Sequence, residues 1–91
     1  MILPTIHDNG TSKDQLVKEL IDVHEALDTA YRVMKETAPN ARDYYPQGPR
    51  KFAIAVEEHL GRLKRLDQIK EEIGELIRGI DALENGRTDG L

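Results

Sequence analysis

Apolar residues spaced alternately by four and three positions run along the first half of this 91-residue chain, and they constrain its fold most. They are Leu16, Leu20, Val23, Leu27, Ala30 and Met34. Positions three and four apart lie on one face of an α-helix, so the spacing predicts the seam of a coiled-coil-like helix. Val17, Ile21 and Tyr31 widen this stripe. A stripe this wide indicates a helix that packs against more than one neighbour.

A second and longer apolar stripe begins after residue 49. It consists of Phe52, Val56, His59, Leu63, Leu66, Ile69, Ile73, Leu76, Ile80 and Leu83. The step from Leu66 to Ile69 repeats a spacing of three, so we expect the stripe to drift around the helix there. Gly61, Gly74 and Gly79 lie inside it, and each costs about 1 kcal/mol relative to alanine in an exposed helix. These glycines indicate either close backbone approach or a bend.

Capping and helix-breaking residues set the ends of the predicted elements. Ser12 followed by Gln15 matches a capping box, and Pro39 disfavours helical backbone angles in the residue before it. Pro49 suits the first position of a second helix, and Asn85 with the glycine after it is a helix-ending pair. We therefore predict one domain with an extended arm (strand or coil) over 1–11, a helix over 12–37, a loop over 38–48, a helix over 49–85 and a flexible tail over 86–91.

These elements predict an all-α fold, an antiparallel two-helix hairpin with a short extended N-terminal arm. Folding the chain back through the loop pairs Met34 with Phe52, and the first helix then ends near Glu72. Five large apolar side chains are expected to project beyond that end, and each costs roughly 1.5–3 kcal/mol in water relative to burial. They are Ile73, Leu76, Ile77, Ile80 and Leu83.

The projecting end of the second helix needs a cover, and a two-helix hairpin by itself has little core. The N-terminal arm, with Ile2, Leu3 and Ile6, is placed to fold over it, and a second copy of the chain could also pack there. Because both apolar stripes are wider than one partner helix buries, we expect a homodimer that forms a four-helix bundle.

Composition excludes several classes of protein. The chain has no cysteine, which rules out a disulfide scaffold and a thiolate zinc site and fits a reducing compartment. No apolar run approaches the roughly 20 residues of a membrane span, and the N-terminus lacks the pattern of a signal peptide. The formal net charge of -4 disfavours nucleic acid as the main partner, because phosphates bind basic groups. We expect a cytoplasmic protein without membrane contact.

Groups that could bind a metal or catalyse a reaction are few. In the predicted register His24 and His59 lie about one turn apart, with Asp28 on the same face, and such a set could hold a metal. The Glu-x-x-His motif of di-iron bundles is absent, because Ile21 and Val56 stand three residues before the histidines. Acidic residues on the second helix fall where side chains should face water, so we predict no metal, no cofactor and no catalytic residue. They are Glu57, Glu58, Glu71, Glu72 and Glu75.

Arg62, Lys64 and Arg65 form a modest basic stretch on the second helix. It supports an alternative function, a small nucleic-acid-associated regulator that contacts phosphates. The stretch lacks interleaved aromatic residues and belongs to an acidic chain, so the competing interpretation is surface charge that pairs with acidic neighbours.

The loop carries the most distinctive segment of the sequence. Arg42, Tyr44 and Tyr45 gather near Phe52, and tyrosine and arginine are frequent at binding hot spots. Either the tyrosines cap the open end of the core, or the segment contacts a partner. The candidate interaction residues are these three loop residues and the five projecting apolar residues of the second helix.

Three short patterns carry a resemblance: NGTS at 9–12, AP at 38–39 and RDYYPQG at 42–48, ahead of a long helix. The chain resembles small uncharacterised proteins encoded by bacteriophages and prophages. That group has no established activity, so the resemblance carries over no catalytic residues. It implies a bacterial cytoplasm as the setting. We expect a non-enzymatic structural or protein-interaction module of phage or prophage origin, a homodimer that binds another phage or host protein.

Overall fold

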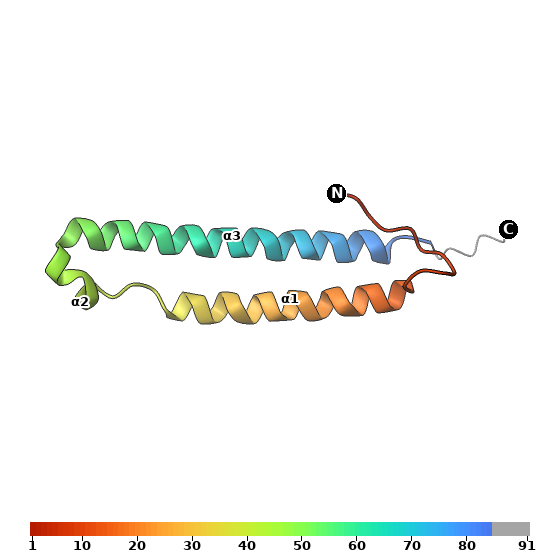
Figure 1. Cartoon of the computed structure of the whole chain (residues 1–91), viewed down its shortest axis with the longest axis horizontal. Coiled ribbons are helices and arrows are strands. Elements are labelled where there is room, and N and C mark those ends of the chain that lie inside the picture. Colours follow the sequence, from red (N-terminus) through yellow and green to blue (C-terminus); the bar gives the residue numbers. More distant parts are fainter. Residues whose placement is uncertain (85–91) are drawn as a thin grey trace.

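The computed structural model places two long antiparallel helices side by side and joins them through a short folded connection (Figure 1). It describes residues 1–84, which form α1 (Lys13–Glu36), α2 (Ala41–Tyr44), a 3-10 turn η1 (Tyr45–Gln47) and α3 (Pro49–Asp81). The molecule is a rod of 70 × 19 × 17 Å. The predicted all-α hairpin is confirmed. The arm is coil, because no residue within 1–84 belongs to a strand.

The ends of α1 and the start of α3 follow the predicted signals. Ser12 caps α1, and its hydroxyl accepts a hydrogen bond of 3.1 Å from the backbone N–H of Gln15. Pro49 occupies the first turn of α3, where its missing N–H costs nothing.

The second helix, predicted to run to residue 85, ends at Asp81. The N–H of Leu83 bonds to the carbonyl of Ile80 at 3.0 Å, which tightens the last turn. The Lys13 ammonium donates to the carbonyl of Leu83 at 2.9 Å, so that carbonyl has a partner outside the helix. The predicted stop at 85–86 and the predicted tail over 86–91 lie outside the described residues.

The connection predicted as a loop over 38–48 contains α2 and η1. The side chain of Asn40 caps α2 by accepting the N–H of Arg42 at 2.9 Å. Gly48 then adopts a φ of 98°, in the region that only glycine enters without strain, and α3 begins directly after it. The folded connection packs on the first turns of α3, which extend beyond the end of α1 (Figure 1).

The predicted register of the two helices is wrong by about 12 residues, or roughly 18 Å. Lys70 lies opposite Asp28, with their charged atoms 3.0 Å apart, and His24 lies beside Gly74. The prediction assumed that the connection only reverses the chain. Instead α2 and η1 cover the first turns of α3, and α1 therefore packs further along α3.

This register covers the five side chains that were predicted to project beyond α1. Ile80 is only 1% exposed, the most buried large side chain within residues 1–84. The other four are partly buried, and they are Ile73, Leu76, Ile77 and Leu83. The predicted projection beyond α1 is therefore wrong. Of the two further covers weighed for these residues, the N-terminal arm is present, and a second copy stays a prediction.

The seam between the helices alternates steps of four and three without drift. On α3 it consists of Phe52, Val56, His59, Leu63, Leu66, Lys70, Ile73, Ile77 and Ile80, all at least partly buried. On α1 it consists of Lys13, Val17, Leu20, His24, Leu27, Tyr31 and Met34, all partly buried. Val23, Ala30 and Ile69, predicted in the seam, are exposed. His24, Tyr31 and Lys70 take their places in the seam. The aromatic rings or aliphatic chains of these residues pack between the helices, although their ends are polar.

The N-terminal arm folds over the end of α3, as predicted. The side chain of Leu3 lies against Gly79, where an added Cβ would stand 2.9 Å from a Leu3 methyl carbon. Ile6 is buried, whereas Ile2 is 96% exposed and takes no part in the cover. Gly79 therefore provides the close backbone approach that interior glycines allow.

Replacing Ile80 tests this packing. We expect Ile80→Ala to lower the free energy of unfolding by about 2–5 kcal/mol, because it leaves a cavity where arm and helices meet. The control Ile2→Ala removes the same atoms from an exposed site and should change it by less than about 0.5 kcal/mol. Urea unfolding followed by circular dichroism measures both. Equal losses in the two variants would contradict the packing.

Candidate protein-interaction surfaces

A polar cluster occupies the middle of the seam. Lys70, whose side chain is 21% exposed, donates a hydrogen bond to Asp28 on α1 and lies 3.9 Å from Asp67 on its own helix. Its ammonium is 5.3 Å from the centre of the Tyr31 ring, within reach of a cation–π contact. Arg32 approaches the second oxygen of Asp28 at 3.8 Å. One lysine thus ties the two helices together.

The cluster shifts the pKa values of Asp28 and Lys70, each in the direction that favours the charged form. The hydrogen bond from Lys70, and then its charge, lowers the pKa of Asp28 below the ordinary value of 3.8. The same hydrogen bond raises the pKa of Lys70 above 10.5, against the opposing effect of its partial burial.

On each helix the residues that flank the seam form two rows, one on either side of it. One row of α1 and one row of α3 together form each side of the hairpin, and the two sides differ. The polar side is the one of the two whose flanking rows contain charged residues. It consists of Asp14, Ile21, Asp28 and Lys35 on α1 and of Leu60, Asp67, Gly74 and Asp81 on α3. A shallow hollow lined by Ile21, His24, Gly74 and Ile77 together with Glu25 and Arg78 lies here and confirms that these two rows adjoin.

The opposite side is apolar, and we call it the apolar side face. It consists of Leu16, Val23 and Ala30 on α1 and of Ile69, Leu76 and Leu83 on α3. In the observed register Leu16 lies near the level of Leu83, and Ala30 lies near the level of Ile69. Ile69 is 50% exposed, and Val23 is also exposed. Ala26 and Val33 extend the face along α1. Val23, Ala30 and Ile69 form the exposed part of this face, whereas Leu16, Leu76 and Leu83 are partly buried at the end where the N-terminal arm lies against Gly79. Exposed apolar side chains that adjoin on two helices can form an interaction surface.

The histidines do not form the metal site that was weighed in the sequence. His24 faces Gly74, and His59 lies 15 residues before Gly74 on α3, about 22 Å away along the helix. His59 is 7% exposed, and its Nε2 atom has no hydrogen-bond partner. Within residues 1–84, no three His, Asp or Glu side chains lie close enough together to hold a metal ion.

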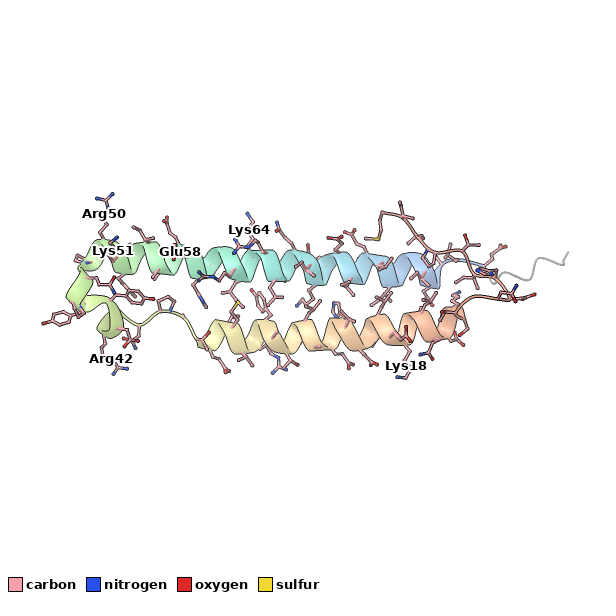
Figure 2. The ribbon with its side chains drawn as sticks, viewed as in Figure 1. Lys18, Arg42, Arg50, Lys51, Glu58 and Lys64 are labelled. Atoms are coloured by element: carbon pink, nitrogen blue, oxygen red, sulfur yellow. The ribbon has the colours of Figure 1, made fainter. Side chains whose placement is uncertain are left out.

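The charged residues of α3 that the sequence singled out lie on its exposed surface. All five glutamates are exposed, and Figure 2 shows Glu58 and Lys64 pointing away from α1. Arg62 and Lys64 are two residues apart and therefore point to nearly opposite sides of the helix, since each residue turns it by about 100°. The basic stretch does not form one strip along which a phosphate backbone could run. The nucleic-acid hypothesis gains no support from this arrangement.

The connection forms a pocket at its end of the hairpin, which we call the loop-end pocket. It has a volume of about 240 Å³ and is lined by Ala41, Tyr44, Tyr45, Gly48, Pro49 and Phe52. The rings of Tyr44 and Phe52 are in contact, with centroids 6.2 Å apart, whereas Tyr45 is 81% exposed. The structure therefore assigns the two tyrosines different positions. Tyr44 helps to close the core, and Tyr45 stands at the surface.

Comparison with protein-family models, with curated proteins and with solved structures gives no match. Neither long helix within residues 1–84 has an apolar stretch that could cross a membrane.

The apolar side face went unrecognised in the sequence, although a signal for it was present. Leu16, Val23 and Ala30 recur at a spacing of seven on α1, as do Ile69, Leu76 and Leu83 on α3. A seven-residue repeat beside a separate seam predicts a second contact row. The seam was predicted to contain Leu16, Val23, Ala30, Ile69, Leu76 and Leu83, because apolar residues are expected in a core before Lys70, His24 or Tyr31.

Replacing Asp28 tests the polar cluster. We expect Asp28→Asn to lower the melting temperature near neutral pH. The contribution of Asp28 is complete above its ordinary pKa of 3.8 and is lost as the pH falls through its lower folded-state pKa. The contribution of Lys70 is complete below 10.5 and is lost as the pH rises through its higher folded-state pKa. The melting temperatures of the wild-type protein and of Asp28→Asn should therefore differ at neutral pH and become equal at strongly acidic and at strongly basic pH. A difference independent of pH would contradict the assignment.

Proposed function

We propose that this protein is a non-enzymatic protein-interaction module that acts as a homodimeric helical bundle, assembled through the apolar side face. The observation that carries the proposal is the group of exposed apolar residues that α1 and α3 share within this face, Val23, Ala30 and Ile69. Two hairpins stacked by this strip make a four-helix bundle, in which each side face covers the other. The resemblance to phage and prophage proteins suggests a bacterial cytoplasm as the setting and a phage or host protein as the further partner.

The small core of the hairpin supports self-association. Within residues 1–84 the buried residues are Ile6, Ala55, His59 and Ile80. A two-helix rod of 70 × 19 × 17 Å leaves most of its side chains within reach of solvent. Burying the apolar side face would also enlarge a core that contains few fully buried residues.

The charges that border the apolar side face favour an antiparallel dimer. Arg65 and Glu72 lie on the same edge of α3, seven residues apart, with Ile69 near the midpoint between them. A two-fold axis beside Ile69 therefore brings Arg65 of each copy to Glu72 of the other. A parallel dimer stacks α3 on α1 of the second copy instead. In that arrangement Arg65 lies near the level of Val33 and Glu72 near the level of Ala26, so the two charges do not meet.

Two exposed apolar residues on opposite sides of α3 make a matched test of this face. We expect Ile69→Glu to weaken self-association at least about 100-fold, because two carboxylates would be buried together at the dimer axis. Leu60→Glu, at a site that is 57% exposed on the polar side, should leave the dimer intact. Light scattering after size-exclusion chromatography reports the mass, and circular dichroism confirms the helix content. A monomeric wild-type protein at all concentrations, or equal effects of both substitutions, would refute the proposal.

A charge exchange tests the direction of packing. We expect Arg65→Glu and Glu72→Arg each to raise the dimer dissociation constant about three- to ten-fold at low salt, because each places like charges opposite one another. The double variant restores opposite charges and should return close to the wild-type value. Sedimentation equilibrium measures all four proteins. If the double variant instead dimerises more weakly than either single variant, so that the two losses of binding free energy add, the antiparallel arrangement is contradicted.

A further inference from the structure

We propose that the loop-end pocket binds an acidic segment of a partner protein and takes up one bulky apolar side chain of that segment. The inference deepens the proposed interaction function and rests on it, but it does not depend on the dimer. The residues that line the pocket come from α2, from η1 and Gly48, and from the first turn of α3, and these elements lie at the end of the rod beyond α1 (Figure 1). The apolar side face consists of residues of α1 and of the second half of α3 and its end.

The dimensions of the pocket favour a side chain over a small-molecule ligand. Its volume of about 240 Å³ is below the roughly 300–1,000 Å³ that is usual for cofactor and metabolite sites. The lining side chains are aromatic or aliphatic, and Gly48 contributes no side chain. An added Cβ at Gly48 would meet no atom within 4 Å, so the space beside it is open. A leucine or phenylalanine side chain suits such a pocket.

The walls of the pocket are held in place before any partner binds. Asn40 caps α2, the N–H of Gly48 bonds to the carbonyl of Tyr45 at 3.2 Å, and Tyr44 contacts Phe52. Tyr45 follows α2 directly and presents its ring at the rim, where 81% of it is exposed. An exposed tyrosine on a fixed backbone loses little entropy on binding, which is why such residues are frequent hot spots.

The charge around the pocket selects an acidic partner. Three cations adjoin its lining residues in the chain: Arg42 follows Ala41, and Arg50 and Lys51 follow Pro49. Asp43 is the one acidic residue within 41–51. Figure 2 shows Arg42 and Arg50 pointing outward on opposite sides of the loop end. A segment that extends to either side of a bound side chain would approach them. This end is basic although the chain has a net charge of -4. Carboxylates on both sides of an apolar anchor match this arrangement. A nucleic acid would use the cations but would gain nothing from the apolar pocket.

Nuclear magnetic resonance titration of the isotopically labelled full chain tests the inference. The probe is a short peptide with a central Leu-Phe pair between runs of Asp and Glu. The comparison ligands are the same peptide with Ser-Ser at the centre, the same peptide with Lys in place of its acidic residues, and a single-stranded oligothymidylate. We expect saturable shifts confined to residues 41–52 with the acidic Leu-Phe peptide alone.

Variants separate the pocket from general charge. Tyr45→Ala, and Arg42→Glu combined with Arg50→Glu, should each weaken binding about five-fold or more. The matched control Lys64→Glu reverses an exposed charge on α3 away from the pocket and should have no effect. No shifts at millimolar peptide, equal binding of the Ser-Ser or Lys peptide, or shifts with the oligonucleotide alone would each overturn the inference. Ile69→Glu should leave peptide binding unchanged, so the dimer and the pocket can fail independently.

Discussion

The pairing of Lys70 with Asp28 is the interaction on which the arrangement of the hairpin depends. A lysine inside a helical seam must keep its ammonium paired, and a single polar seam residue is known to fix register for this reason. Sliding α1 by one heptad would place Ile21 or Lys35 opposite Lys70 in place of Asp28. The first leaves Lys70 with only Asp67 of its own helix, at 3.9 Å, and the second brings two cations together. The observed register is the one that satisfies the lysine.

Both interaction surfaces follow from this register. It brings the apolar flanking row of α1 level with that of α3, so that the two rows merge into one face instead of two separate stripes. It also leaves the first turns of α3 beyond the end of α1. The connection must then fold over those turns, and in doing so it forms the loop-end pocket between Tyr44, Tyr45 and Phe52. A single polar pair thereby determines where the protein can bind.

The sequence predicted the local elements well and their mutual placement poorly. Ser12, Pro39 and Pro49 mark helix ends through backbone chemistry that acts within a few residues, and those ends were found. The register depends on how compactly residues 38–48 fold, which hydrophobic spacing does not reveal. Hydropathy also ranked Ile69 above Lys70 as a seam residue, although a lysine stem can pack and its charge can pair across the seam. The role of the loop tyrosines in binding stays a prediction. The N-terminal arm was correctly named as a cover for the end of α3, whereas the contact of α1 with that end was missed, because it depends on the register.

The most direct test of this account is a distance between spin labels on the two helices. The chain has no cysteine, so Lys35→Cys with Lys64→Cys places labels only at those sites. Lys35 lies seven residues after Asp28, and Lys64 lies six residues before Lys70, so the structure puts them within about 2 Å of the same level along the helices. Electron–electron resonance, with labelled protein diluted in unlabelled protein, should give one short intramolecular distance. A distance lengthened by an axial offset of about 20 Å, as the register that pairs Met34 with Phe52 requires, would contradict the account.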